Sequence, residues 1–303
     1  MPFPLRLGSR GSPLALIQAR MVSAALCAAH GWGEDAIEIV PIRTGGDRIQ
    51  DRPLAEIGGK ALWTREHDRA LIEGEIDFAV HSMKDVETVR PLGIAIAAML
   101  PRADVRDRLV GAASLDALPH GARIGTSSPR RSAQLLRRRP DFRIVLFRGN
   151  VDTRLARLER GEAEATLLAA AGLDRLGRSD VGHAIGIETM LPAPAQGAVG
   201  VEALAARREL HALLAAIDDA ETSSCVLAER ALLAALGADC RSPVAALATR
   251  AGNRLWLRAE IYSEDGRECE AGEMWLDTPA DARHLARYLL DRAGPALKAL
   301  FTG

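Results

Sequence analysis

Lysine is scarce in this chain of 303 residues. It occurs only at Lys60, Lys84 and Lys298, so 36 of the 39 basic residues (39 − 3) are arginines. Arginine presents a planar fork of donors, whereas lysine is a point charge on a flexible stem, so the two are not interchangeable. The retention of Lys84 beside Asp85 makes this pair a candidate for function. The alternative is that one lysine in three lies there by chance.

Aromatic residues make up only 4% of the chain, and the formal net charge is −1. Proteins that bind single-stranded nucleic acid interleave aromatic and basic residues. A near-neutral chain also does not favour bulk attraction to nucleic acid or to a membrane surface. Continuous apolar runs stay below the roughly 18 residues that span a bilayer. Residues 21–29 resemble part of a signal peptide, but no clean cleavage pattern follows them, so we expect the end of a helix.

The four cysteines, Cys27, Cys225, Cys240 and Cys269, show no Cys-x-x-Cys or Cys-x-x-His spacing. Neither a zinc site nor a disulfide framework is therefore indicated. A reducing compartment fits this pattern, so we expect a cytoplasmic protein.

Positive charge is concentrated in the middle of the chain. Residues 123–160 hold eleven arginines and three acids, a local net charge of +8 (11 − 3). Residues 218–303 hold fourteen acids and ten bases, a net charge of −4 (10 − 14). The length suggests about two domains, and the charge distribution favours a small anionic partner.

The N-terminal pattern predicts a strand, a helix and a second strand. Residues 5–7 and 37–42 read as the strands, and Ser12 and Pro13 read as the N-cap and first residue of the helix. The free N–H groups of a helix start attract anions, and Arg10 lies beside them. Residues 44–60 form a long glycine-rich connection of the length of a mobile lid, and a disordered surface loop is the alternative.

The apolar run at residues 76–80 predicts a buried strand that ends in the polar stretch containing Lys84 and Asp85. Further along, Ser128 and Pro129 predict a helix start after a strand at 123–125. Arg130 and Arg131 then occupy the first turn, where positive charge opposes the helix dipole. An anion bound at that end would remove this conflict, so we favour a functional role for both arginines.

Other arginines occupy comparable positions. Arg148 ends a predicted strand at residues 142–147, Arg154 lies at the following helix start, and Arg175 follows a strand at 166–169. Strand ends of open α/β sheets line a crevice. Arginines gathered there repel one another unless carboxylates or phosphates bind them, and carboxylates suit the guanidinium fork.

The last third of the chain has a different pattern. Residues 101–104 and 192–201 are candidate hinge strands, and after residue 218 a helix precedes three alternating strands, at 244–249, 255–261 and 273–276, and a helix at 280–300. This predicts a small α+β domain. Cys240 lies on its first loop beside Arg241, which favours the thiolate, although an inert loop thiol is the simpler interpretation of the spacing.

Taken together, the motifs closely resemble the porphobilinogen deaminase (hydroxymethylbilane synthase) family. They follow the family's order and spacing over essentially the whole chain. The matching segments are Ser9-Arg10-Gly11-Ser12-Pro13, Gly58-Gly59-Lys60, His81-Ser82-Met83-Lys84-Asp85, Gly125-Thr126-Ser127-Ser128 with Arg130-Arg131, Arg148-Gly149-Asn150, Ala171-Gly172-Leu173, Gln196-Gly197-Ala198-Val199-Gly200, and Cys240 with Pro243.

The resemblance implies an α/β fold with two lobes like those of periplasmic binding proteins, joined by hinge strands, and a small α+β C-terminal domain. We expect residues 1–100 with 197–217 in the first lobe, 101–196 in the second and 218–303 in the third domain. The implied enzyme is a transferase of tetrapyrrole biosynthesis, and nothing in the sequence suggests more than a monomer. It condenses four porphobilinogen molecules, each with two carboxylate arms, with loss of one ammonia each, and releases linear hydroxymethylbilane by hydrolysis with water.

By resemblance, Cys240 holds a dipyrromethane cofactor through a thioether, which replaces the inert-thiol interpretation. Asp85 is the implied catalytic carboxylate: it stabilises the cationic azafulvene left by loss of ammonia, binds pyrrole N–H groups and moves protons. Lys60 belongs to the lid. The remaining implied site residues are Lys84, Ser128, Arg130 and Arg131, with Asp85, around the cofactor, and Arg10, Ser12, Arg148, Arg154, Arg175 and Gln196 around the substrate and growing chain.

Departures from the family pattern concern the lid and the cysteine loop. Glu56 and Trp63 differ from the residues usual near Lys60, and Ala238-Asp239 replaces two glycines before Cys240. The main rival interpretation is a two-lobed solute-binding protein for a small anion. Such a protein would carry an export signal and would need neither Cys240 nor Asp85.

Overall fold

The computed structural model describes residues 4–43 and 64–301. The predicted lid, with Glu56 and Lys60, and the neighbouring Trp63 lie outside the described residues. The chain divides into two compact units. In its described part, unit 1 comprises residues 4–43, 64–103 and 197–223, and unit 2 comprises 104–196 and 224–301. Two of these divisions fall in the predicted hinge segments, and the exact boundaries of the three predicted domains stay a prediction.

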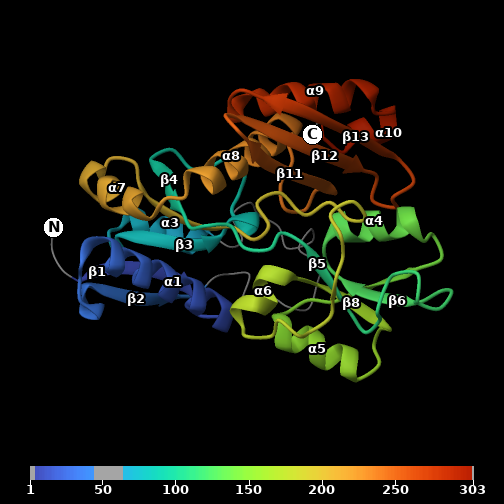
Figure 1. Cartoon of the computed structure of the whole chain (residues 1–303), viewed down its shortest axis with the longest axis horizontal. Coiled ribbons are helices and arrows are strands. Elements are labelled where there is room, and N and C mark those ends of the chain that lie inside the picture. Colours follow the sequence, from blue (N-terminus) through green and yellow to red (C-terminus); the bar gives the residue numbers. More distant parts are fainter. Residues whose placement is uncertain (1–3, 44–63, 302–303) are drawn as a thin grey trace. The chain divides into compact units, whose positions relative to one another are not determined.

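Unit 1 is built on a five-stranded sheet with the order β2-β1-β3-β10-β4. Strands β1 to β4 are labelled in Figure 1. The first three strands in this order are parallel, and β10 is antiparallel to β3 and β4. The predicted N-terminal strand–helix–strand unit is therefore confirmed. The strands are β1 (Leu5–Arg10), β2 (Ile37–Ile42), β3 (Phe78–Ser82), β4 (Ile94–Met99) and β10 (Val199–Leu204).

Helix α1 (Pro13–His30) covers one face of this sheet and has the predicted ends. The Ser12 hydroxyl accepts a hydrogen bond from the Ala15 N–H at 3.4 Å, and Gly31 ends the helix in the left-handed conformation with φ 67°. By length and composition alone, α1 is the single helix of the described chain that could cross a membrane. A core helix passes the same test, and α1 buries Val22 and Leu26 against the sheet. The other helices of unit 1 are α3 (Arg65–Ile72), α7 (Arg208–Leu214) and the short 3-10 turns η1 (Glu34–Ala36), η3 (Met83–Asp85) and η4 (Ala215–Ile217).

Unit 2 contains a second five-stranded sheet with the order β7-β6-β8-β5-β9. Strand β6 is parallel to β7 and β8, while β5 is antiparallel to β8 and β9. Strands β5 and β9 have four and two residues and were not predicted from the sequence, because such short strands leave little periodic pattern. The strands are β5 (Asp107–Val110), β6 (Arg123–Thr126), β7 (Arg143–Leu146), β8 (Ala165–Ala169) and β9 (His183–Ala184), and the helices are α4 (Pro129–Arg138), α5 (Val151–Glu159) and α6 (Ala170–Arg175).

The last part of unit 2 is the predicted antiparallel sheet with order β11-β12-β13, covered by helices. The single helix predicted at residues 280–300 is wrong, because α9 ends at Arg292 and a separate helix begins at Pro295. Proline lacks the N–H that a continuous helix would need there. The elements are α8 (Ala220–Leu236), β11 (Val244–Ala251), β12 (Arg254–Tyr262), β13 (Cys269–Leu276), η5 (Pro279–Asp281), α9 (Ala282–Arg292) and α10 (Pro295–Ala299).

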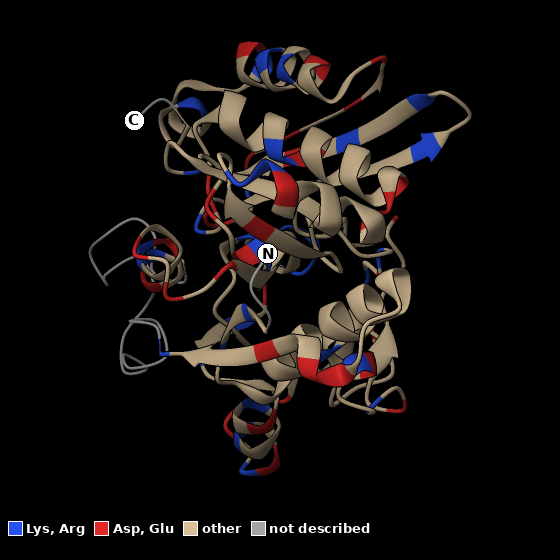
Figure 2. Cartoon of the chain, turned by 90° about the vertical axis from the view of Figure 1, so that its left-hand side faces the viewer, with Lys and Arg blue, Asp and Glu red and all other residues tan. Residues whose placement is uncertain are grey.

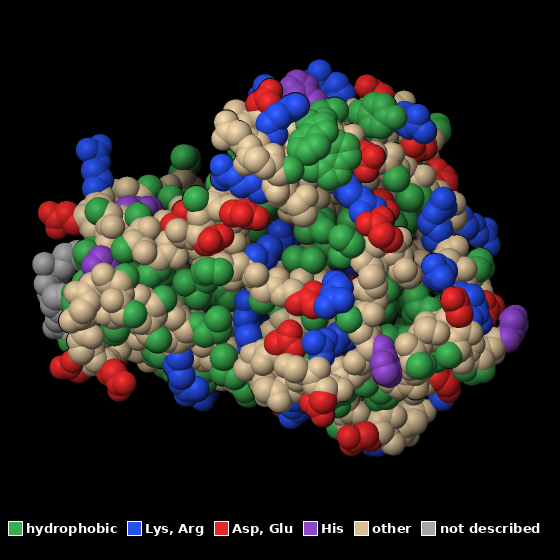
Figure 3. Space-filling model, in the orientation of Figure 1, with side chains coloured by type: hydrophobic (Ala, Val, Ile, Leu, Met, Phe, Trp, Pro, Cys, Tyr) green, Lys and Arg blue, Asp and Glu red, His purple; other side chains and the backbone are tan. Residues whose placement is uncertain are grey.

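The expected fold class is confirmed: two lobes with mixed sheets and helices, and a smaller sheet-and-helix domain. Charges of both signs are interspersed on the surface, as on α9 at the top of Figure 2. In the space-filling view, many basic side chains lie beside acidic ones (Figure 3), which agrees with the numerous exposed Arg–carboxylate pairs, such as Arg160 with Glu162. Such pairs add little stability. The exposed pairs therefore do not by themselves mark a functional site.

Candidate functional site

In unit 1, β1 ends at Arg10, and Ser12 caps α1 directly after it. Arg10 is half-buried, and the buried Ser9 hydroxyl donates to the Ala15 carbonyl at 3.1 Å. This bond holds the end of β1 against the first turn of α1. Arg10 and Ser12 thus lie at a helix start, where N–H groups favour anions, as the sequence predicted.

The neighbouring parallel strand β3 ends at Ser82 and leads into η3, which carries Lys84 and Asp85. Both side chains are half-buried. Ser82 also exchanges hydrogen bonds with the buried amide of Gln18 on α1, with the amide nitrogen 2.8 Å from the hydroxyl. Since β1 and β3 are parallel neighbours, Arg10, Lys84 and Asp85 lie at the same edge of this sheet.

Met83 fixes the position of this turn. Its side chain is 1% exposed, and its N–H donates to the Ala198 carbonyl at 3.1 Å. A Cβ added to Gly200 on β10 would lie 2.1 Å from Met83 Sδ, so only glycine leaves room for Met83. Glycine at position 200 therefore lets the methionine anchor the residues that follow it.

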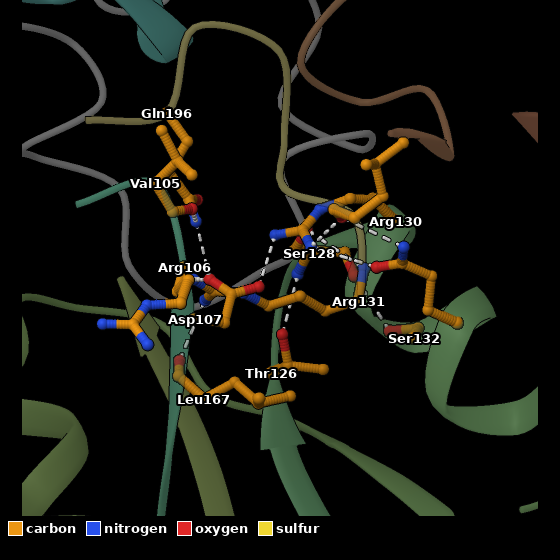
Figure 4. Close-up of polar contacts among 12 residues, drawn as sticks. Val105, Arg106, Asp107, Thr126, Ser128, Arg130, Arg131, Ser132, Leu167 and Gln196 are labelled. Carbon is orange, nitrogen blue, oxygen red and sulfur yellow. Dashed lines mark hydrogen bonds and ion pairs between the residues drawn. The ribbon is translucent and has the colours of Figure 1, made fainter. Parts of the chain in front are cut away.

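In unit 2, α4 begins as predicted, with the Ser128 hydroxyl accepting from the Arg131 N–H at 3.4 Å. The side chains of Arg130 and Arg131 converge on Asp107 (Figure 4). The distances are 2.8 Å from Arg130 Nη2 to Asp107 Oδ2, as an ion pair, and 2.7 Å from Arg131 Nη2 to Asp107 Oδ1. All three side chains are at least nine-tenths buried.

Asp107 is the residue that sequence reasoning missed. Burial alone would raise its pKa, but the charges of Arg130 and Arg131 hold the pKa of Asp107 well below its usual range. The sequence predicts that an anion at this helix start would remove the conflict between the helix dipole and the two arginines. Asp107, at the start of β5, supplies one such carboxylate from within the chain.

The pair of arginines retains a surplus of positive charge, since one carboxylate faces two guanidiniums. Arg131 Nη1 donates to the Leu167 carbonyl at 2.9 Å, and Arg130 Nη1 donates to the Leu191 carbonyl at 3.1 Å. Among the described residues, the Nε atoms of both arginines are buried without a hydrogen-bond partner. An unmatched buried donor is unfavourable, so a further acceptor at these atoms would stabilise the cluster.

Gln196 belongs to the same cluster. Its side chain is buried, and its Nε2 donates to the Val105 carbonyl at 2.7 Å and to Asp107 Oδ1 at 2.9 Å. Gln196 thus orients the Asp107 carboxylate, which in turn orients Arg130 and Arg131. Its contact with substrate stays a prediction.

The other predicted arginines of unit 2 lie at the ends of strands and helices of its five-stranded sheet layer. Arg148 follows β7 and is 8% exposed. Arg154, on the helix capped by Asn150, donates from Nε to the Gly149 carbonyl at 3.1 Å. Arg175 ends α6, and burial lowers the pKa of its guanidinium. Strands β6, β7 and β8 are parallel, so their carboxyl ends share one edge. That this edge and the one in unit 1 line a common cleft stays a prediction.

Cys240 lies on the turn between α8 and β11 and is the exposed one of the four cysteines. The Asp239 carboxylate pairs with Arg241 at 2.7 Å next to it. Cys225 is buried, and burial raises the pKa of the Cys269 thiol to about 11. Cys240 is therefore the accessible candidate for covalent attachment. The described residues contain no cluster of three or more His, Cys, Asp or Glu side chains that could hold a metal ion.

The sequence matches two domain families. One is described as "Porphobilinogen deaminase, dipyromethane cofactor binding domain" and matches residues 5–212. The other is "Porphobilinogen deaminase, C-terminal domain" and matches residues 223–291. The chain belongs to the porphobilinogen deaminase family.

Relatives in this family match the chain almost end to end. A porphobilinogen deaminase from Sphingopyxis alaskensis is 58% identical over 304 residues, which cover 98% of this chain and 96% of the relative. One from Paracoccus denitrificans is 54% identical over 273 residues, or 89% of this chain and 87% of the relative. The resemblance stated from the motifs is thus confirmed.

Solved structures of solute-binding proteins are also similar to part of this chain. A periplasmic binding protein of Salmonella typhimurium with high arginine specificity is 12% identical, with a TM-score of 0.42, and covers 73% of this chain and 93% of its own. A substrate-binding domain from a putative amino acid transporter of Streptococcus pneumoniae is 13% identical, with a TM-score of 0.43, and covers 70% of this chain and 90% of its own.

The porphobilinogen deaminase family uses a dipyrromethane cofactor, and the described residues fit such a group. The cofactor is a polycarboxylate joined through sulfur. Unit 2 offers an exposed thiol at Cys240 and a buried guanidinium pair, Arg130 and Arg131, whose Nε donors lack a partner in the described chain. Both features match the chemistry that the family's cofactor needs.

Proposed function

We propose that this chain is a hydroxymethylbilane synthase, a transferase that condenses four molecules of porphobilinogen into linear hydroxymethylbilane. Membership of the porphobilinogen deaminase family over nearly the whole chain supports this assignment. The observation that carries it is the Lys84–Asp85 turn at the end of β3, because a cation and an acid–base group stand together at a sheet edge.

The proposal assigns each predicted residue a role. Cys240 holds the dipyrromethane through a thioether, and Lys84, Ser128, Arg130 and Arg131, with Asp85, bind around it. When bound, this cofactor supplies the pyrrole from which the chain grows. A thiol that must stay reduced before attachment fits a cytoplasmic enzyme, and we include a monomeric state in the proposal. Arg10, Ser12, Arg148, Arg154, Arg175 and Gln196 serve the carboxylates of porphobilinogen and of the growing chain.

Asp85 transfers protons in each condensation. The bond between the methylene carbon and the amino nitrogen of porphobilinogen breaks, and ammonia leaves. A new carbon–carbon bond joins that methylene to a ring carbon of the terminal pyrrole, which then loses a proton. Asp85 delivers a proton to the leaving amine and accepts the one from the ring carbon. Its negative charge also stabilises the cationic state between the two events.

The arginines act through charge. Every added pyrrole brings two carboxylates, and the guanidinium fork binds a carboxylate through two parallel hydrogen bonds. Asp107 and Gln196 hold Arg130 and Arg131 in place before any ligand arrives. The cation cluster is thus preorganised, and binding need not order it.

Product analysis with porphobilinogen tests the proposal. Purified protein should release four molecules of ammonia for each hydroxymethylbilane formed, and both should appear at a steady rate. A solute-binding protein with the same lobes would instead bind porphobilinogen and return it unchanged. Tight binding without ammonia release would contradict the proposal.

A further inference from the structure

A buried ion cluster in unit 1 lies beside the Met83–Asp85 turn and has no role in the chemistry described so far. At its centre is Arg90, whose side chain is 8% exposed. Three carboxylates surround it: Asp68 on α3, Glu87 in the segment that follows Asp85, and Glu202 on β10.

All five N–H donors of Arg90 are used. Nε and Nη2 bind the two oxygens of Glu202 at 2.7 and 2.9 Å. Nη1 donates to Glu87 at 2.7 Å and to the Thr64 hydroxyl at 3.1 Å, and Nη2 also donates to Asp68. A fork that is satisfied at every donor has one orientation, so Arg90 joins three elements rigidly.

The cluster is strongly charged although it is buried. Glu202 is fully buried, and His81 Nε2 lies 3.3 Å from its carboxylate. Burial alone would raise the pKa of Glu202, but His81 and Arg90 hold it at about 2, so the carboxylate is ionised at neutral pH. Burial raises the pKa of Asp68 and of Glu87. Removing the one guanidinium would leave these acids without their principal counter-charge.

The segment from Met83 to Arg90 is held at two ends. At its start, Met83 packs against Gly200, and the Val86 N–H donates to the Met83 carbonyl at 3.3 Å. After Val86 it has little apolar anchoring, because Val89 is 76% exposed. The polar contacts of Glu87 and Arg90 fasten the far end of the segment that carries Asp85.

We infer that Arg90 is a positioning residue for the Met83–Asp85 turn. Its guanidinium fastens the residues that follow Asp85 to α3 and β10, and so fixes the direction of the Asp85 carboxylate. The inference rests on the proposed function, in which Asp85 is the catalytic group. A displaced catalytic carboxylate lowers the rate of the chemical step more than it changes substrate binding.

Arg90→Lys tests the inference, since lysine keeps the charge but cannot reproduce five fixed donors. We expect kcat for hydroxymethylbilane formation to fall roughly 10- to 100-fold while KM for porphobilinogen changes less than about threefold. Arg90→Met should also lower kcat more than it changes KM, with a larger fall in kcat than Arg90→Lys. Rates are measured below the unfolding transition of each variant, with folding checked by circular dichroism.

Leu71→Ala is the matched control. Leu71 lies on the same helix, α3, and is 1% exposed. Its apolar side chain belongs to a hydrophobic cluster and forms no hydrogen bond with the groups that bind Arg90. This variant should lower Tm, as a buried large-to-small change does, while kcat stays within about twofold of wild type. If the wild-type protein releases ammonia and Arg90→Lys has the wild-type kcat, this inference is overturned and the proposed function is not. A wild-type protein without ammonia release would overturn the proposed function together with it.

Discussion

Asp85→Asn should leave the protein folded and reduce hydroxymethylbilane formation by at least about 1000-fold. Asparagine keeps the size of the side chain but can neither carry a proton between the two reacting groups nor supply a negative charge. Loss of general acid–base catalysis costs about 10²- to 10⁴-fold, and loss of a preorganised charge costs a similar factor. Asp85 lies on η3, whose backbone is held by the buried Met83, so the turn itself should persist.

Steady-state rates and thermal melting of the variant measure this prediction. Asp35→Asn is a suitable control, because Asp35 is an exposed carboxylate in the same unit, on the 3-10 turn before β2. It should keep both the wild-type rate and the wild-type Tm. A rate in Asp85→Asn within tenfold of wild type would remove Asp85 from its catalytic role.

Asp107→Asn should destabilise the protein by about 3–5 kcal/mol, the usual cost of breaking a buried ion pair by removing one partner. Two buried guanidiniums would then face a neutral amide. For a chain of this length we expect Tm to fall by on the order of 10 °C. Because the arginines would lose their orientation, turnover should fall as well, even where the variant is folded.

The pH dependence of this effect follows from the lowered pKa of Asp107. A carboxylate whose pKa is lower in the folded state stabilises the protein above its unfolded pKa, near 3.9, and that stability is lost as pH falls through the folded value. The difference in stability between wild type and Asp107→Asn should therefore be full at neutral pH and should shrink progressively as pH falls below about 4.

Denaturant titrations at several pH values test this second prediction. Asp116→Asn provides the control, since Asp116 is 72% exposed and lies 3.4 Å from Arg138 on the surface of the same unit. An exposed pair contributes little, so this variant should unfold like wild type. Equal stability of Asp107→Asn and wild type at neutral pH would show that Arg130 and Arg131 do not depend on Asp107.

Local signals in the sequence predicted the helix starts well. Ser12 before Pro13 and Ser128 before Pro129 each accept a backbone N–H at the first turn of the predicted helix. For the helix that carries Arg154 the sequence allowed either Asn150 or Asp152, and the structure has Asn150 as the cap. Capping is a contact between residues three positions apart, so the sequence contains nearly all the information needed. Pro295, which starts a separate helix, is a further local signal of this kind in the sequence.

Contacts between distant residues could not be predicted in the same way. Asp107 lies 24 positions before Arg131, on a four-residue strand that also carries an arginine, and no periodic pattern marks it. Arg90 and Glu202 are 112 positions apart and meet because β10 inserts beside β3. Pairing of this kind depends on sheet order, which the local pattern does not specify. The family resemblance supplied the roles of Asp85 and Cys240 but gave no reason to select Asp107 or Arg90.

The mass of the intact purified protein tests the central claim most directly. We predict that the wild-type chain carries a single addition equal to two linked pyrroles, that digestion places it on the peptide containing Cys240, and that it is absent from Cys240→Ser. An active wild-type chain with the mass of its bare sequence, or the same addition on Cys240→Ser, would contradict the account.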